Sequence, residues 1–229
     1  MPGNTVTVLI PAYNEEDYVG DTVRASWDIP GVVQVLVIDD GSRDGTAGAA
    51  LNSGSEVVSL VKNRGKGVAL NAGAGLVRGD LLILLDADLG KSASRAAKLL
   101  IPVMDGLVDM TVAVFPDAKR KAGLGLVKGL ARAGIKHFTG LVAEAPLSGQ
   151  RAMRRSVFDH CLPLAGGFGV EVDFTVRAGI MGYSILEVPV DMMHRETGRD
   201  ISGFIHRGRQ FCHVARALMA VKRPGCGDD

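Results

Sequence analysis

Two carboxylates, Asp86 and Asp88, have the clearest chemical spacing in this chain. They follow the apolar run 81–85 (LLILL), which predicts a strand buried on both faces of a sheet. Side chains alternate along an extended chain, so acids two residues apart point the same way. Such a strand end faces the crevice where open α/β folds bind ligands, and paired carboxylates suit Mg²⁺ or Mn²⁺. For the Asp86/Asp88 pair taken alone, the alternative is an Asp-rich loop that caps the next helix.

The elements that would position this pair begin with a strand at 5–10 (TVTVLI), which Pro11 stops. Asn14, with Asp17 three residues later, suits the start of a helix that runs to about Trp27. A dinucleotide-binding turn needs glycines where this chain has Pro-Ala-Tyr-Asn-Glu, so the sequence excludes a Rossmann dehydrogenase.

A second apolar strand, 33–38, delivers Asp39 and Asp40 to the same edge. A carboxylate there can accept N–H groups from a uracil or guanine ring, or equally from the next helix. A third strand, 56–61, leads to the cationic loop 63–67 (NRGKG), which suits close approach to a phosphate. A helix over 68–77 follows.

Composition fits a globular protein of one large domain or two small ones, with 229 residues, 47% hydrophobic and 22% charged. Three scattered cysteines form neither a disulfide framework nor a zinc pattern, and no signal peptide or membrane span is visible. These features predict a cytoplasmic protein. Residues 1–115 carry 9 Lys/Arg and 14 Asp/Glu, whereas residues 116–229 carry 17 and 11, so an acidic half faces a basic half.

The succession VLIPAYNEED, VLVIDDGSRDGT, NRGKGVALNAG and GDLLILLDADLG resembles the nucleotide-binding half of glycosyltransferase family 2 enzymes. The resemblance covers about residues 5–95. It implies an α/β domain with the GT-A fold, a mixed and mainly parallel sheet flanked by helices. We therefore expect one domain over 1–229, with a nucleotide-sugar and metal half (1–115) and an acceptor half (116–200).

The resemblance also implies roles for single residues. Asp88 ligates a divalent cation, Mg²⁺ or Mn²⁺, that bridges the diphosphate, and Asp86 approaches the ribose and the metal. Lys66 lies near the nucleotide, and Asp40, with Asp39, reads the base. The nucleotide-binding set is Pro11, Ala12, Tyr13, Asn14, Glu15, Asp39, Asp40, Lys66, Asp86 and Ala87. After Asp-x-Asp-Leu this chain has Gly90, whereas many polyprenyl-phosphate sugar transferases have Gln at that position.

In the second half, 109–115 predicts a strand, and the basic, glycine-containing segment 117–137 predicts a mobile segment or a loose amphipathic helix near the acceptor. Its basic side chains could instead form an ordinary solvated surface. Ser148, Gly149 and Arg151 resemble the family's Ser-Gly-(Phe/Gln)-Arg segment, which ends a strand beside the acceptor. They could hold a phosphate or carboxylate.

Residues 166–173 (GGFGVEVD) open a helix to about Met181. They resemble the Gly-Tyr-Gly-Val-Glu segment of glucosyl-3-phosphoglycerate synthases, which implies that Glu171 contacts the acceptor or acts as base. Asp173 is a second candidate, although a helix N-terminus favours acids in any case. After a strand at 184–190, the same resemblance makes His194 a third metal ligand. The stretch Arg195-x-x-Gly198 resembles one in dolichyl- and polyprenyl-phosphate sugar transferases, which implies that Arg195 binds the acceptor.

Apolar residues recur at helical spacing over 201–223, with arginines off that face, and 224–229 predicts a disordered tail. Such a basic helix can dock on its own domain, pair with a second subunit, or lie on an anionic membrane at the inner membrane face. Nucleic-acid binding is not expected, because the basic residues lack interleaved aromatics.

Together these features predict a metal-dependent glycosyltransferase that uses a nucleoside diphosphate sugar, UDP before GDP. The expected acceptor is anionic, either a polyprenyl phosphate or a small phosphorylated or carboxylated metabolite. A sugar-1-phosphate nucleotidyltransferase and a non-catalytic nucleotide-sugar-binding protein are the alternatives. The first would want a Gly-rich basic loop where this chain has PAYNEE.

Overall fold

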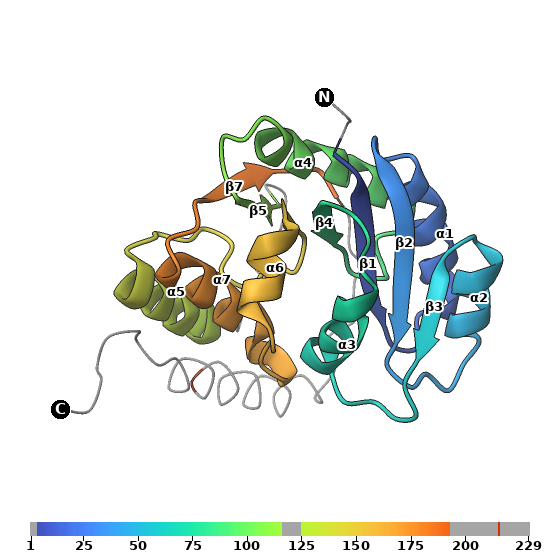
Figure 1. Cartoon of the computed structure of the whole chain (residues 1–229). Helices are drawn as coiled ribbons and strands as arrows, with labels where there is room; N and C mark the ends of the chain where they lie inside the picture. The colour runs from blue at the N-terminus through green and yellow to red at the C-terminus, as the bar shows by residue number, and fades with distance from the viewer. Residues whose placement is uncertain (1–3, 116–124, 193–214, 216–229) are drawn as a thin grey trace.

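The computed structural model describes residues 4–115, 125–192 and position 215. Within them lies a seven-stranded sheet of order β3-β2-β1-β4-β6-β5-β7 (Figure 1). Strand β6 runs antiparallel to both of its neighbours, and the other pairings are parallel. The strands are β1 Val6–Ala12, β2 Val32–Asp39, β3 Glu56–Ser59, β4 Leu81–Leu84, β5 Met110–Val114, β6 Arg151–Arg154 and β7 Ile185–Pro189.

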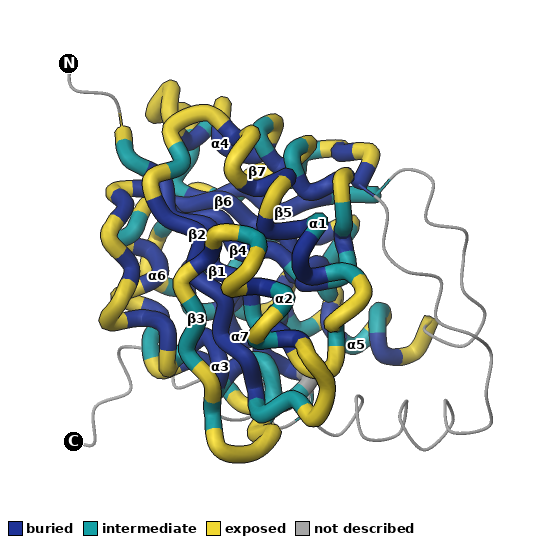
Figure 2. The backbone as a smooth tube through the Cα atoms, turned by 90° about the vertical axis from the view of Figure 1, so that its right-hand side faces the viewer, coloured by how far each residue is buried: buried dark blue, intermediate teal, exposed yellow. Residues whose placement is uncertain are grey.

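Helices cover both faces of this sheet because its central strands are apolar on both sides. Figure 2 shows that these central strands are buried. In β1, Val8 and Ile10 pack into one core with α1, α2 and α4, whereas Leu9 packs into the other with α3, α6 and α7. The helices are α1 Glu16–Trp27, α2 Thr46–Asn52, α3 Lys66–Gly73, α4 Ala97–Met104, α6 Arg155–Cys161 and α7 Val170–Ile180, with 3₁₀ turns η1 Ala74–Leu76, η2 Gly90–Ala96 and η3 Gly167–Gly169.

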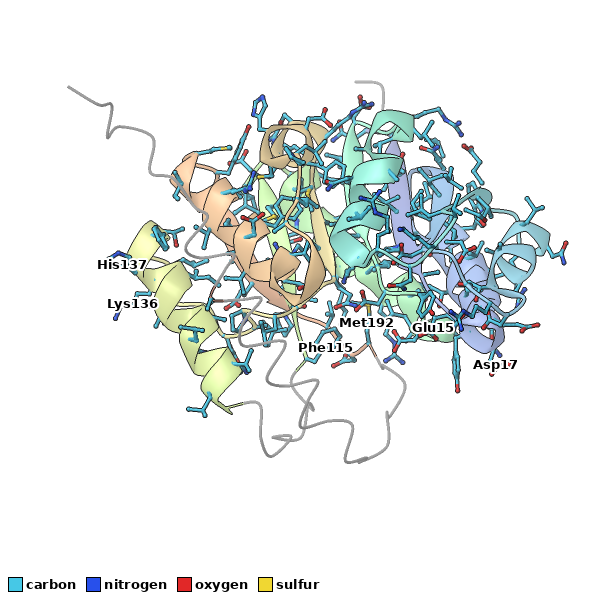
Figure 3. All side chains as sticks on the ribbon, turned by 90° about the horizontal axis from the view of Figure 1, so that it is seen from below. Glu15, Asp17, Phe115, Lys136, His137 and Met192 are labelled. Carbon is cyan, nitrogen blue, oxygen red and sulfur yellow. The ribbon has the colours of Figure 1, made fainter. Side chains whose placement is uncertain are left out.

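Helix α5 (Gly125–Thr139) packs on α7 through Val127, Ala131 and Ile135, which are spaced four residues apart and lie on one face. Of the two expectations for 117–137, the amphipathic helix is confirmed for residues 125–137, because this apolar stripe outweighs the low helix propensity of the glycines. Lys136 and His137 lie on the outer side of the helix (Figure 3). No helix in the described ranges is long and apolar enough to cross a bilayer.

Several boundaries differ from the expectations. Asn14 does not cap α1, which begins at Glu16; it adopts φ 55° and its side chain accepts the backbone N–H of Arg43 at 2.9 Å. Helix α3 begins at Lys66, two residues earlier than expected. Ser148 and Gly149 precede β6 instead of ending a strand. Other predictions lie outside the described residues, apart from position 215: those for residues 117–124, His194 and Arg195, the predicted helix over 201–223 and the predicted tail.

The thiol of Cys161 is enclosed at the end of α6, and burial raises its pKa to about 12. In the unfolded chain a thiol ionises near pH 8.5, so its contribution to stability falls as the pH rises from about 8.5 towards 12. With Cys212 and Cys226 changed to Ser, we expect Cys161 to react with Ellman's reagent at pH 8 only after denaturant unfolds the protein. Rapid labelling of the native protein would contradict this burial.

Candidate active site

The predicted strand-end acids meet at the carboxyl edge of the sheet, towards which the β1, β2 and β3 arrows point in Figure 1. Figure 3 views the molecule from that side. Because β6 is antiparallel, its amino end reaches the same edge: Leu84 at the end of β4 pairs with Arg151 at the start of β6. Side chains from the first and second halves of the chain therefore meet beyond β4.

A charged cluster of Lys66, Asp86 and Glu171, called the lysine centre below, lies at this meeting point. Lys66 Nζ, at the start of α3, lies 2.5 Å from Asp86 Oδ1 and 3.2 Å from Glu171 Oε1, which belongs to α7. The second carboxylate oxygen of Asp86 accepts the Gln150 amide N–H at 2.6 Å. One lysine thus bridges a predicted nucleotide-side acid and a predicted acceptor-side acid.

Burial by itself would lower the pKa of Lys66, but Asp86 and then Glu171 raise it, and the net pKa lies above the ordinary value. The ammonium is therefore charged throughout the neutral range. It can pair with an anion but does not act as a base there.

The turn after β4 holds Asp88. Burial alternates from half-buried Asp86 to buried Ala87 to half-buried Asp88, as expected if both acids face one side. The Thr22 hydroxyl of α1 fixes the turn: it donates to the Ala87 carbonyl at 2.7 Å and accepts the Gly90 N–H at 2.8 Å. The turn therefore has an anchor that does not use either carboxylate.

The two acids supply the hard oxygen donors that Mg²⁺ or Mn²⁺ prefers, so the donor set fits a divalent cation. No group of three or more His, Cys, Asp or Glu side chains suited to a metal occurs among the described residues. The predicted third ligand, His194, lies beyond them, so the predicted triad stays a prediction.

Asp39 and Asp40 are both nearly buried at the end of β2. Asp40 accepts the backbone N–H groups of Arg64 and Gly65 at 2.9 and 2.7 Å, and Asp39 accepts that of Ser42 at 3.0 Å. Asp40 thereby holds the cationic loop beside the end of the sheet. Base reading by these acids stays a prediction.

The loop after β1 lies against the loop after β2. The Asn14 and Glu15 N–H groups donate to Ser42 Oγ and Thr46 Oγ1 at 2.9 and 2.8 Å. Within the predicted nucleotide-binding stretch, Tyr13 is 39% exposed, Ala12 is buried, and Pro11 and Glu15 are half-buried. The exposed ring of Tyr13 is the surface on which a base could stack.

The arginine of the predicted acceptor segment, residues 148–151, makes its hydrogen bonds within the protein. Arg151 is 1% exposed, donates to the backbone oxygens of Ser148 and Glu171, and lies over the Phe174 ring. These bonds tie the segment before β6 to the start of α7. Contact of Arg151 and Ser148 with an acceptor stays a prediction, and Arg195 lies outside the described residues.

Asp173 forms hydrogen bonds with residues outside the lysine centre. Its carboxylate accepts the Ala165 N–H at 3.1 Å and pairs with Arg177 at 2.9 Å, and the residue is 1% exposed. Both oxygens thus serve the packing of α7. A catalytic role for Asp173 stays a prediction that none of these contacts favours, so Glu171 is the stronger candidate.

Gly149 allows the lysine centre to form. A Cβ there would fall on Lys66 Nζ and lie 3.2 Å from Asp86 Oδ1. We expect Gly149→Ala to fold, because the lysine tip can move, but to lower kcat/KM about 100-fold by displacing the ammonium. The matched control is Gly48→Ala in α2, where a Cβ meets nothing within 4 Å. Equal activities of the two variants would contradict this role for Gly149.

A hollow of about 410 Å³ lies at the other end of β4, where Asp80 and Leu81 line it with Arg154, Arg155 and Asp159. Arg154 pairs with Asp109 at 3.4 Å and Arg155 with Asp159 at 3.3 Å. Its arginines are engaged with neighbouring acids, so the carboxyl edge is the better candidate for the site.

A mainly parallel sheet with helices on both faces, and an acid pair beyond a central strand, defines the class of GT-A-type nucleotide-sugar transferases. The chain belongs to glycosyl transferase family 2, whose sequence model matches residues 7–162. The resemblance in the four sequence motifs is thereby confirmed.

Known relatives agree with this family. The chain is 30% identical to "Glycosyltransferase AglJ" of Haloferax volcanii over 205 residues, 86% of this chain and 66% of that protein. It is 31% identical over 171 residues to undecaprenyl-phosphate 4-deoxy-4-formamido-L-arabinose transferase of Pseudomonas aeruginosa, covering 70% of this chain but 50% of that protein. The chain therefore spans about half to two thirds of these two relatives.

Among solved structures, glucosyl-3-phosphoglycerate synthase of Mycobacterium tuberculosis is similar over 99% of this chain and 82% of its own, with a TM-score of 0.78 and 27% identity. That crystal contains phosphoglyceric acid. Another crystal of the synthase, with a TM-score of 0.78 and 26% identity, contains Mn²⁺, UDP and phosphoglyceric acid. The GT-A fold expected from the sequence is thus confirmed.

Proposed function

We propose that this protein transfers a sugar from a UDP-sugar to an anionic acceptor in a reaction that depends on a divalent cation. The observation that carries the proposal is the Asp86 carboxylate beyond β4, held between Lys66 and Gln150, with Asp88 two residues further on. The preference for UDP and an anionic acceptor draws on the synthase, crystallised with Mn²⁺, UDP and phosphoglyceric acid, and on the undecaprenyl-phosphate transferase.

Asp86 and Asp88 would hold the cation. When bound, the cation would offset the negative charge that develops on the departing diphosphate. Lys66 would add a permanent positive charge at the same place, and the exposed Tyr13 ring would lie along the base. These groups bind and orient the donor.

Where the acceptor presents a hydroxyl, Glu171 would accept its proton, since Glu171 is the acid that Lys66 joins to the donor side. The backbone carbonyl of Glu171 accepts a hydrogen bond from Arg151 at 2.7 Å, which holds the start of α7 in place, and the Glu171 side chain is 15% exposed. The Glu171 side chain can therefore contact an acceptor while the backbone of α7 stays in place.

The test is a thermal-shift screen of UDP, GDP and their sugars with and without Mn²⁺, followed by turnover assays. A ligand that binds only the folded state raises Tm, so base and metal preference appear together. We expect UDP with Mn²⁺ to give the largest shift, and a UDP-sugar to be consumed once an acceptor phosphate is present. Exchange of pyrophosphate into a nucleotide sugar would point to a nucleotidyltransferase, and metal-independent binding without turnover to a non-catalytic binding protein.

A further inference from the structure

Gln150 is a buried polar residue directly beside the candidate site. It is 1% exposed and comes immediately before β6. Its side-chain N–H donates to Asp86 Oδ2 at 2.6 Å, and its side-chain oxygen lies 3.5 Å from the Ser148 hydroxyl. A neutral amide that donates to a carboxylate makes a charge-assisted bond, which is stronger than a bond between neutral groups.

The reversed direction of β6 places this amide next to Asp86. Leu84 pairs with Arg151, so the residue before Arg151 lies level with the chain just beyond β4, where Asp86 follows. Lys66 holds the other oxygen of the same carboxylate at 2.5 Å. The carboxylate plane of Asp86 is therefore fixed at both oxygens, by a cation on one and a neutral amide on the other.

We propose that Gln150 is a positioning residue for sugar transfer, whose amide holds the Asp86 carboxylate in the orientation that receives the donor diphosphate and its cation. The inference rests on the proposed function. Without the amide, one oxygen of Asp86 loses its donor and the carboxylate can rotate towards Lys66. Loss of a hydrogen-bond partner that orients a metal-site acid typically costs about 10- to 100-fold in affinity or activity.

Gln34 provides a matched comparison within the same sheet. It is also 1% exposed, and its side-chain amide bonds Thr7, Glu56 and the Leu76 carbonyl, away from the lysine centre. Replacing either glutamine removes a buried amide from a strand or its end. Only Gln150 contacts a candidate site residue, so stability and site geometry can be separated.

The test compares Gln150→Met, Gln150→Asn and Gln34→Met with the wild type. The measurements are Tm, calorimetric binding of UDP with Mn²⁺, and kcat and KM for transfer. We expect Gln150→Met to weaken UDP–Mn²⁺ binding by about 10- to 100-fold and to lower kcat. Gln150→Asn, which keeps an amide on a shorter side chain, should lie between Met and wild type, and Gln34→Met should lower only Tm.

Wild-type binding and kcat in Gln150→Met would overturn the positioning role. If that variant does not fold, Gln150→Asn with wild-type affinity for Mn²⁺ and UDP, together with wild-type kcat, overturns it equally. If the wild type binds neither UDP nor Mn²⁺, the proposed function itself fails, and the role assigned to Gln150 fails with it.

Discussion

Asparagine in place of Asp88 is expected to lower transfer from a UDP-sugar at least about 1,000-fold, a loss of about 4 kcal/mol of transition-state stabilisation. The substitution keeps the size of the side chain and removes one of two negative oxygen donors beyond β4. The turn itself should persist, because Thr22 anchors it through Ala87 and Gly90 without using Asp88. Steady-state kinetics over a range of Mn²⁺ concentrations, with Tm as the check on folding, measures the effect.

Asp21→Asn is the matched control for this change. Asp21 is a partly exposed acid of α1 that pairs with Arg24 three residues later, and such surface pairs contribute about 0–1 kcal/mol. Its removal should leave kcat/KM and the UDP-induced Tm shift unchanged. A fully active, Mn²⁺-dependent Asp88→Asn enzyme would show that the metal site lies elsewhere.

The strand-end acids could be found from the sequence because each follows an apolar run long enough to mark a buried strand. Asp39, Asp40 and Asp86 therefore lie at the predicted edge of the sheet. Glu171 was found through a glycine-rich helix start and a family resemblance, and α7 begins one residue before it. The strand-end positions follow from local patterns that a single sequence displays, whereas the candidate role of Glu171 also depends on the family resemblance.

Contacts that depend on strand direction could not be found in this way. Strand β6 is four residues long, Arg-Ala-Met-Arg, with no period that distinguishes it from a helix start. Its antiparallel placement brings Gln150 to Asp86, and no residue near Gln150 signals that partner. The burial of Arg151 could not be predicted for a similar reason, since an arginine two residues after a glycine suggests an exposed anion site until its internal acceptors are seen.

Lys66 forms ion pairs with acids from both halves of the site, and we expect its replacement to have the second large effect. Lys66→Met keeps the length of the side chain but leaves Asp86 and Glu171 without their shared cation. We expect kcat/KM to fall by about 100- to 1,000-fold, because a fixed positive charge beside the leaving diphosphate is lost. Stability should fall by about 1–2 kcal/mol, less than for a fully buried ion pair because both acids remain partly exposed.

Lys98→Met is the matched control for this prediction. Lys98 forms an ion pair with Asp191 at 3.6 Å, in which both side chains are more than half exposed. Its loss should change neither Tm nor kcat/KM measurably. The contrast isolates the effect of a lysine placed between two acids at the sheet edge from the general loss of a positive charge.

Lys66→Arg separates charge from shape. The guanidinium restores the positive charge, but Gly149 approaches the Lys66 ammonium so closely that not even a methyl group fits between them. We therefore expect Arg to recover stability more fully than activity. If Lys66→Arg restores both stability and activity, the positive charge alone suffices. If Lys66→Met retains wild-type turnover and UDP affinity, Lys66 only stabilises the protein without ligand, and donor binding depends on Asp86 and Asp88.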